Sequence, residues 1–237
     1  MENKLLDLCS LLDKNDYPGR GILLGKTPDG TKSVLAYFIM GRSENSRNRV
    51  FEKTEDGIRT RAFDPSKMSD PSLIIYHPVR THEQRTIVTN GDQTDTIYDF
   101  VKDCGCFVKA LKTRRFEPDK PNFTPRISGI LYHLEDFSYK LSILKAADEN
   151  GSACNRFTYD YEPLSGVGHL IHTYEKNGDP IPSFQGEPRA VAVPDNMDTL
   201  AEMLWSSLNT DNKVSLYVRY TDLKTLDFEE KIINKNS

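Results

Sequence analysis

The spacing of apolar residues at the start of the chain changes from a helical to a strand pattern. From Leu5 to Leu12 apolar residues recur at i, i+3, i+4 and i+7, which predicts a helix over residues 3–14. Two β-prone runs follow at 20–25 and 32–40, joined by a Pro- and Gly-containing turn, and this predicts a hairpin. Both alternating positions of the second run are apolar, so we expect that strand to be buried on both faces.

The same strand pattern recurs before the first long helix. Further strands are predicted at 49–53, 73–79 and 84–89. The period then changes to 3.6, and one continuous apolar stripe from Ile97 to Leu111 predicts a single long helix.

The second half of the chain repeats this alternation of strands and helix. Four strands are predicted between Arg126 and Tyr174, and a second helix carries the apolar series Met197 to Leu208 after a Pro-Asp-Asn start signal. A final strand is predicted at 213–220.

These runs of strands broken by two helices predict an α+β fold with helices packed on sheets. We find no internal repeat, and the Gly- and Pro-rich segment 175–188 is too short to separate domains. A single domain over residues 1–237 is therefore expected.

Composition places the chain among globular proteins. Apolar residues make up 37% of the 237 residues and charged residues 28%. The 31 basic and 35 acidic residues give a net charge of -4, so no general attraction to nucleic acid or to an anionic membrane is expected, and any anion site must be local. No apolar run approaches the ~20 residues of a membrane helix, and without a recognisable targeting signal a cytoplasmic location is expected.

The cysteines and histidines do not form a metal-binding pattern. Cys9, Cys104, Cys106 and Cys154 include no C-x-x-C pair, so we expect them to be reduced and mostly buried. The pair His169 and His172 is three residues apart in a predicted strand, where such residues point to opposite faces. Phosphate-binding glycine loops are also lacking, so neither a metal nor a nucleotide cofactor is expected.

The densest polar cluster follows the predicted strand 32–40. It holds Arg42, Arg47 and Arg49 together with Ser43 and Ser46. Arginine forks match phosphate oxygens, and serine hydroxyls complete such sites, so a phosphomonoester pocket is one reading. A solvated polar loop is the other.

A second cluster, residues 89–96, lies where a strand meets the long helix. Asp92 and Asp95 stand three apart, as N-cap and N3 residues do, so capping is one interpretation. Two carboxylates would repel a phosphate, so a ligand here would present a hydroxyl or amide, as a ribose or base does.

A third cluster combines Glu117, in a polar loop, with Arg126 at the start of an apolar strand. Glu117 is a candidate general base and Arg126 a partner for a carboxylate or phosphate. The alternative is a surface loop with a solvated glutamate.

Residues of all three polar clusters belong to a series of four sequence motifs that follow one another in a recognisable order. They are Tyr17-Pro18-Gly19-Arg20-Gly21 with the following Ile22-Leu23-Leu24-Gly25, Gly41-Arg42-Ser43 through Arg49, Asn90-Gly91-Asp92 with Thr94-Asp95-Thr96-Ile97, and Thr124-Pro125-Arg126-Ile127. Together they resemble the archaeal-type IMP cyclohydrolase family (IMP cyclohydrolase-like proteins). The resemblance is strong over residues 17–135 and weaker beyond, and residues 1–16 look like an N-terminal helical extension.

The resemblance implies a four-layer αββα sandwich of the N-terminal-nucleophile (Ntn) hydrolase type, with two antiparallel-rich sheets between helical layers. It also implies the last step of purine biosynthesis, in which 5-formamidoimidazole-4-carboxamide ribotide closes its ring, releases water and gives IMP. The family is not self-processing, and Glu2 after Met1 provides no nucleophile. Because nucleophile and electrophile belong to one molecule, positioning needs no cofactor.

Residue roles follow from the same resemblance. Arg42, Ser43 and Arg49 resemble contacts to phosphate or to developing charge, and Tyr76 and Glu117 resemble acid/base groups, so Tyr76, Glu117 and Arg42 are the expected catalytic residues. The expected substrate contacts are Arg20, Ser43, Arg47, Arg49, Asn90, Gly91, Asp92, Thr94 and Arg126.

Two other functions are compatible with these residues. A purine-ribotide-binding protein without turnover, acting as a sensor or subunit, would keep the same pocket. An Ntn-like hydrolase of another amide is disfavoured by the missing nucleophile. In each case the partner is a small molecule, and a homo-oligomer is compatible with a sequence that specifies no oligomeric state.

Overall fold

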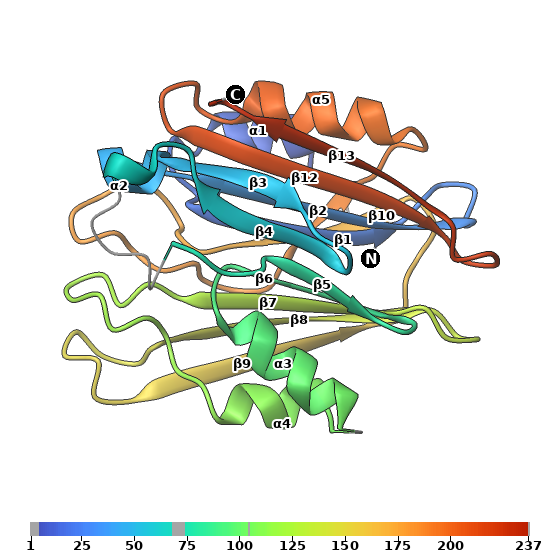
Figure 1. The fold of residues 1–237 in the computed structure, drawn as a ribbon, viewed down its shortest axis with the longest axis horizontal. Coiled ribbons are helices and arrows are strands. Elements are labelled where there is room, and N and C mark those ends of the chain that lie inside the picture. Colours follow the sequence, from blue (N-terminus) through green and yellow to red (C-terminus); the bar gives the residue numbers. More distant parts are fainter. Residues whose placement is uncertain (1–4, 68–73, 104, 237) are drawn as a thin grey trace.

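Two antiparallel sheets, stacked face to face, form the centre of the molecule (Figure 1). The computed structural model describes residues 5–67, 74–103 and 105–236. The six-stranded sheet has the order β11 (Arg189–Ala192), β10 (Val167–His172), β1 (Arg20–Lys26), β2 (Lys32–Met40), β12 (Lys213–Asp222), β13 (Phe228–Asn234). The seven-stranded sheet has the order β3 (Arg49–Lys53), β4 (Gly57–Ala62), β5 (Val79–His82), β6 (Arg85–Thr89), β7 (Arg126–Tyr132), β8 (Ser138–Ala146), β9 (Cys154–Tyr161).

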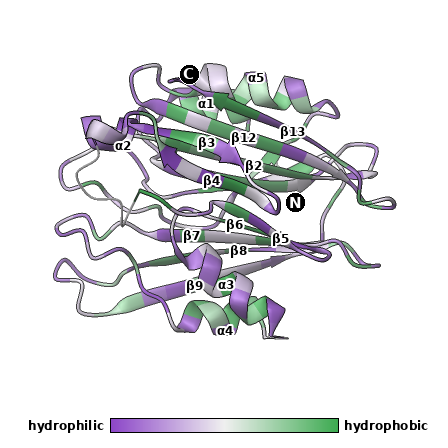
Figure 2. Cartoon of the chain, viewed as in Figure 1, coloured by the Kyte–Doolittle hydropathy of each residue, from purple (hydrophilic) through white to green (hydrophobic). Residues whose placement is uncertain are grey.

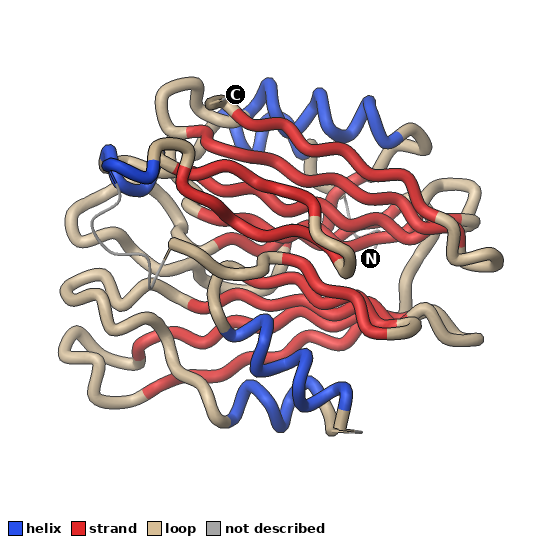
Figure 3. Tube along the Cα trace, in the orientation of Figure 1, coloured by secondary structure: helices blue, strands red, loops and turns tan. Residues whose placement is uncertain are grey.

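Helices cover the outer faces of both sheets (Figure 3). The six-stranded sheet carries α1 (Leu8–Asp13) and α5 (Met197–Ser207), and the seven-stranded sheet carries α3 (Gln93–Lys102) and α4 (Phe107–Lys112). A short helix, α2 (Glu44–Arg47), lies at one end of the sheets, and a 3-10 turn covers Pro65–Lys67. The α+β prediction with two antiparallel sheets is confirmed.

Three hydrophobic layers hold this arrangement together. One lies between the six-stranded sheet and helices α1 and α5, one between the two sheets, and one between the seven-stranded sheet and helices α3 and α4. Figure 2 shows apolar residues along the strands and polar residues in the connecting turns. Each fully buried large apolar side chain contributes roughly 1.5–3 kcal/mol relative to an exposed one.

Strand β2 belongs to two of these layers at once. Val34, Ala36 and Phe38 pack toward the helices, whereas Leu35 and Tyr37 pack between the sheets. The prediction that this strand is buried on both faces is confirmed, and so is the hairpin that joins it to β1.

The N-terminal helix is shorter than predicted. Asp7 caps α1 by accepting from the Ser10 backbone N–H at 2.8 Å, so the described chain before Asp7 is not helical. Instead, Leu6 lies along β11, and its N–H donates to the Ala190 carbonyl at 2.9 Å. The edge of the sheet thus takes the residues that the apolar spacing had assigned to a helix.

The single long helix predicted from Ile97 to Leu111 is two helices. The Gly105 N–H donates to the Phe100 carbonyl at 2.6 Å, and a Cβ on Gly105 would lie 2.5 Å from that oxygen. The apolar stripe runs across the break because α3 and α4 pack on one core.

The strand predicted at 73–79 is also wrong over its described part. Residues 74–78 are irregular, residue 73 lies outside the described ranges, and β5 begins at Val79. Tyr76 pairs with a single residue of β4: the Thr60 N–H donates to the Tyr76 carbonyl at 2.9 Å, and the Tyr76 N–H donates to Thr60 Oγ1 at 2.9 Å. A side-chain hydroxyl therefore replaces the backbone carbonyl of a regular strand pair. The spacing of apolar residues cannot predict such a replacement.

The other predicted elements are present, and four short ones were missed. The four strands after Arg126, the helix beginning after Asn196 and the strand from Lys213 are confirmed. Helix α2 and strands β4, β11 and β13 were not predicted, because they are short or lie at sheet edges where apolar alternation is weak.

Two further properties concern the surface. Cys9 and Cys154 are partly exposed and Cys106 is exposed, so the expected burial is wrong for these three, while Cys104 lies outside the described residues. Among the described helices none has the length and apolarity needed to cross a membrane.

Two buried histidines make the fold sensitive to acid. His133 is hydrogen-bonded to Ser33 Oγ at 2.8 Å, and His172 donates from Nδ1 to the Tyr174 carbonyl at 2.8 Å. Burial lowers the pKa of each to about 4. In the unfolded chain both titrate near the ordinary value of about 6.5, so below that pH the unfolded state binds more protons.

We therefore expect the free energy of unfolding to fall as pH drops from about 6.5 toward about 4, with each histidine contributing about 2 kcal/mol between pH 7 and pH 5. His133→Gln keeps a polar group near Ser33. It should remove the contribution of His133 to the difference in unfolding free energy between pH 7 and pH 5. Urea unfolding of both proteins at pH 7 and pH 5 measures it. An unchanged difference between the two pH values in the variant would contradict the assignment.

Candidate active site

A cavity of about 330 Å³ is lined by residues of α2 and of several loops. Figure 1 shows α2 and long loops at one end of the sheets. The cavity walls come from segments far apart in the sequence. The lining residues are Tyr17, Arg20, Arg42, Ser43, Asn45, Ser46, Arg49, Ile74, Glu117, Asp119, Asn122, Thr124, Tyr174 and Ile181.

Arg49 provides the most unusual group in this cavity. It is the first residue of β3, it is only 1% exposed, and its side chain is the largest of those fully buried. Its Nε donates to the Ser46 carbonyl at 2.8 Å, but neither terminal nitrogen has a hydrogen-bond partner among the described residues. Burial and the nearby charge of Arg20 lower the pKa of Arg49. A guanidinium stays protonated nevertheless, so a charge is present whose terminal nitrogens have no hydrogen-bond partner among the described residues.

Arg20, the first residue of β1, brings a second guanidinium to the same place. Its Nε is buried and has no partner among the described residues. Burial alone would lower the pKa of Arg20, but the phenols of Tyr17 and Tyr174 and the carboxylate of Glu117 raise it. Two guanidiniums face one nearby carboxylate, so this end of the cavity favours an anion.

Glu117 lies in the loop between α4 and β7 and is 4% exposed. Its backbone N–H donates to the Thr124 carbonyl at 2.9 Å, which fixes the loop. Burial raises the pKa of Glu117, although the charges of Arg20 and Arg126 oppose that effect. The alternative of a solvated surface glutamate is wrong, and the raised pKa suits proton transfer nearer neutral pH.

Two stacked tyrosines form one wall. The rings of Tyr17 and Tyr174 have centroids 5.7 Å apart and an interplanar angle of 19°. Gly19 has φ +78°, and a Cβ there would overlap Thr173 and the Tyr174 ring, so only glycine admits this approach. The motif around Tyr17 was recognised from the sequence, but no sequence signal brought Tyr174 to it.

Tyr76 lies behind the cavity wall. Its hydroxyl is 2.9 Å from the Tyr37 hydroxyl, and the residue is buried. It does not line the cavity, yet its phenol is close enough to interact electrostatically with Arg20 and Arg49. Tyr76 thus belongs to the same electrostatic cluster.

The mouth of the cavity is formed by the segment around α2. Arg42 donates from one terminal nitrogen to Asn177 Oδ1 at 2.8 Å and to the Gly178 carbonyl at 2.9 Å, and its guanidinium lies 5.2 Å from the Tyr17 ring centroid. Ser43 caps α2 in a reciprocal capping box with Ser46. The segment 175–188 is therefore tied to the mouth.

Arg47 has a different place from that expected. Its Nε donates to the Gly41 carbonyl at 2.9 Å and a terminal nitrogen donates to Asn212 Oδ1 at 3.0 Å. It does not line the cavity, so the structure makes it a support of the α2 segment rather than part of the binding wall.

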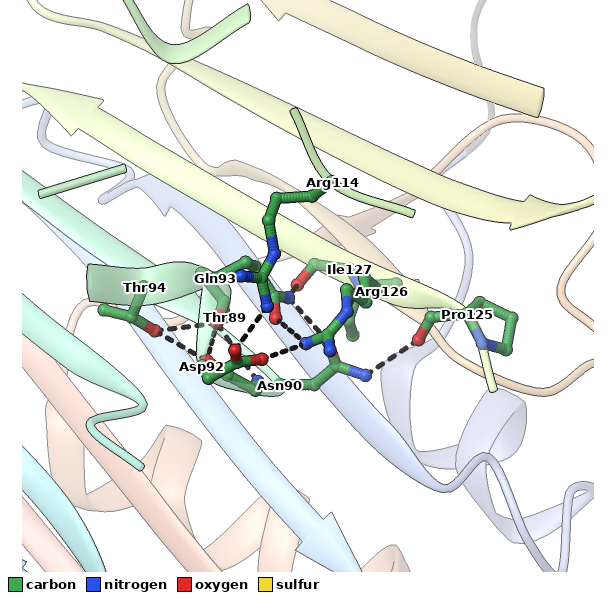
Figure 4. A network of polar contacts seen from close by, with 10 residues as sticks. Thr89, Asn90, Asp92, Gln93, Thr94, Arg114, Pro125, Arg126 and Ile127 are labelled. Atoms are coloured by element: carbon green, nitrogen blue, oxygen red, sulfur yellow. Dashed lines mark hydrogen bonds and ion pairs between the residues drawn. The ribbon is translucent and has the colours of Figure 1, made fainter. Parts of the chain in front are cut away.

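Hydrogen bonds within the loop before α3, and from this loop to Pro125 and Ile127, hold it in place (Figure 4). Asn90 donates from Nδ2 to the Pro125 carbonyl at 2.8 Å and accepts from the Ile127 N–H at 2.9 Å. The hydroxyls of Thr89 and Thr94 are 2.7 Å apart. These buried side chains fasten the α3 start to β7.

Arg126 and Asp92 complete the network in Figure 4. Arg126 donates to Asp92 Oδ1 at 2.6 Å and to Gln93 Oε1 at 2.6 Å, and Arg114 forms a second ion pair with Asp92. Burial alone would raise the pKa of Asp92, but the charges and hydrogen bonds of Arg114 and Arg126 lower it. Asp92 is the N-cap residue of α3 and Asp95 lies in its first turn, as the spacing predicted, but the Asp92 side chain makes no capping bond and Asp95 accepts from Arg80 at 3.0 Å. The predicted positions are confirmed, and the predicted capping bond is wrong.

The structure thus divides the predicted site residues into two groups. Five line the cavity: Arg20, Arg42, Ser43, Arg49 and Glu117. Seven do not: Tyr76, Arg47, Asn90, Gly91, Asp92, Thr94 and Arg126. Contact with substrate stays a prediction for all of them, and the second group surrounds the cavity instead of forming its wall.

Comparison with known proteins covers most of the chain. Residues 17–225 match the family model described as IMP cyclohydrolase-like protein. The IMP cyclohydrolase of Methanopyrus kandleri is 32% identical over 71% of this chain and 89% of the relative, and that of Methanothrix thermoacetophila is 26% identical over 72% and 80%. The IMP cyclohydrolase of Methanococcus aeolicus is 31% identical over 48% of this chain, and the match spans only 58% of that relative.

The buried charge of Arg49 predicts a trade-off between stability and the binding of a small anion. Arg49→Met should raise the unfolding free energy of the ligand-free protein by about 1–3 kcal/mol, because it removes a buried charge whose terminal nitrogens have no hydrogen-bond partner among the described residues. It should also reduce stabilisation by formate, a small anion that fits between the guanidiniums of Arg20 and Arg49. Thermal melts with and without formate measure both effects.

Arg47→Met is the matched control, since Nε and one terminal nitrogen of Arg47 are hydrogen-bonded and the residue does not line the cavity. It should lower stability and leave the formate effect unchanged. Equal destabilisation by both substitutions would show that Arg49 is also a structural residue.

Proposed function

This chain belongs to the family of IMP cyclohydrolase-like proteins, and we propose that its cavity converts 5-formamidoimidazole-4-carboxamide ribotide to IMP with release of water. The observation that carries this proposal is that Arg20, Arg49 and the buried Glu117 meet in one cavity, with buried nitrogens of both arginines that have no partner in the described part of the chain. An anionic substrate whose reaction moves protons and builds negative charge fits that combination.

The two ends of the cavity suit different parts of the ribotide. Arg42 and Ser43 are at the exposed mouth, where a phosphate keeps part of its hydration, and they would hold it. The reacting groups would then point toward Arg20 and Arg49. The cavity volume of about 330 Å³ is in the ordinary range for a small-molecule site.

Ring closure needs positioning and the movement of two protons. The carboxamide nitrogen attacks the formyl carbon, and one proton passes from that nitrogen to the formyl oxygen. As water leaves, a second proton passes from the formamide nitrogen to the departing hydroxyl. Holding the two groups in a near-attack geometry supplies much of the rate because both are in one molecule.

Glu117 and Tyr76 are the proposed proton carriers. Glu117 lines the cavity, and burial raises its pKa, which brings it closer to the pH at which it would exchange a proton with the substrate. Tyr76 lies behind the wall, hydrogen-bonded to Tyr37 and close to Arg49, so it would act on the formyl oxygen through one water molecule. The guanidinium of Arg49 would stabilise the negative charge that this oxygen gathers.

The arrangement of layers supports two further proposals. Helices, sheet, sheet and helices follow one another as in an Ntn-type αββα sandwich, and we propose that type for this fold. The apolar layer shared by the two sheets supports a single domain over residues 1–237. A cytoplasmic location and a homo-oligomer stay predictions from the sequence.

The direct test mixes purified protein with the formylated ribotide, without added metal or nucleotide, and follows IMP by chromatography. Accumulation of IMP above the uncatalysed rate supports the proposal. Tight IMP binding without IMP formation would instead support the ribotide-binding protein without turnover, which no observation at this site favours.

Glu117→Gln and Tyr76→Phe should separate chemistry from binding. Each keeps the shape of the side chain and removes one proton-transfer group, so kcat should fall by about 10² to 10⁴. IMP affinity, measured by calorimetry, should stay within a few-fold.

Tyr220→Phe is the control. The Tyr220 hydroxyl donates to the Pro194 carbonyl on the side of the six-stranded sheet that faces α1 and α5. It should keep wild-type turnover. Folded Glu117 and Tyr76 variants that also turn over at the wild-type rate would exclude these residues as proton carriers.

A further inference from the structure

Three residues of the cavity wall form a hydrogen-bonded chain that the proton-transfer scheme does not use. The Thr124 N–H donates to Asp119 Oδ1 at 2.6 Å, and the Thr124 hydroxyl bonds to Asp119 Oδ2. The same Thr124 hydroxyl is 2.6 Å from the Tyr174 hydroxyl. All three residues line the cavity, and Asp119 and Thr124 share the loop that holds Glu117.

The chemistry of the end groups fixes the direction of these bonds. A carboxylate only accepts hydrogen bonds, so the Thr124 hydroxyl gives its single proton to Asp119. Thr124 Oγ1 must then accept from Tyr174. The Tyr174 oxygen has given away its proton and offers only lone pairs to the cavity.

The position of that oxygen is as well defined as its polarity. Tyr174 is 3% exposed, and its ring is stacked on Tyr17. Burial raises the pKa of Tyr174 to about 12, so the phenol stays protonated near neutral pH and keeps its bond to Thr124. The cavity therefore presents a fixed hydrogen-bond acceptor.

We propose that the chain Asp119–Thr124–Tyr174 makes Tyr174 a specificity residue that accepts a hydrogen bond from a donor group of the ribotide and disfavours a nucleotide with an acceptor at that place. The inference rests on the proposed function, because it takes the ribotide as ligand. The donor is either the ribose 2′-hydroxyl or the ring N1–H. Either group would donate a hydrogen bond to the Tyr174 oxygen.

Three nucleotides distinguish these donors. IMP has both the 2′-hydroxyl and the N1–H, 2′-deoxy-IMP lacks the hydroxyl, and AMP has a lone pair at N1. Calorimetry with wild-type protein should show IMP binding about 10-fold more tightly than the analogue that lacks the recognised donor. Tyr174→Phe should reduce that ratio to near one.

Asp119→Asn tests whether the chain sets the polarity. An asparagine amide can donate to Thr124, which frees the Thr124 proton to point at Tyr174 and turns the Tyr174 proton into the cavity. The preference for IMP over the discriminating analogue should then weaken or invert. In the Tyr174→Phe background the same substitution should have no further effect on the ratio.

A merely structural role gives a different pattern. If Asp119 only holds its loop through the Thr124 N–H, Asp119→Asn lowers the melting temperature and weakens all three nucleotides alike, in both backgrounds, and the inference is overturned. Tyr220→Phe, whose hydroxyl lies outside the cavity, should keep the wild-type ratios.

The outcomes also separate this inference from the proposed function. A wild-type protein that forms IMP, together with a folded Tyr174→Phe variant that keeps the wild-type nucleotide ratios, overturns the inference alone. A wild-type protein that neither binds IMP nor forms it overturns both.

Discussion

The site depends on one constraint: the Arg49 guanidinium is buried, and its terminal nitrogens have no hydrogen-bond partner among the residues that the structure describes. Taking a charge out of water costs several kcal/mol even after relaxation, and the nearby Arg20 adds repulsion. Three hydrophobic layers provide the stability that tolerates this cost. A protein that keeps such a charge in its wall is prepared for an anion that arrives from outside.

The other arginines of the chain show how unusual this is. Arg126 is also buried but is paired with Asp92 and Gln93, and Arg47 is paired with backbone and amide oxygens. These paired residues hold the loops that carry Glu117 and the α2 segment. Scaffold and binding wall therefore use the same residue type, and Arg49 differs from Arg126 in that its terminal nitrogens have no partner among the described residues.

Periodicity and resemblance together predicted most of the fold and five of the fourteen residues that line the cavity. Strand β2, with apolar residues on both faces, and the helix after Asn196 were readable because their signals are local. The break at Gly105 and the Thr60 hydroxyl that replaces a ladder partner were not, because each depends on one contact in space. Tyr174 was missed for the same reason, since its partners Tyr17 and Thr124 are distant in the sequence. The sequence also could not show which arginines find partners.

A crystal structure of the protein with bound IMP tests the central claim most directly, namely that the Arg20–Arg49 end of the cavity is the reactive end. The account predicts the phosphate at Arg42 and Ser43, with C2 of the purine, the former formyl carbon, facing Arg49 and Glu117. A phosphate seated between Arg20 and Arg49, with the base toward the mouth, would contradict it.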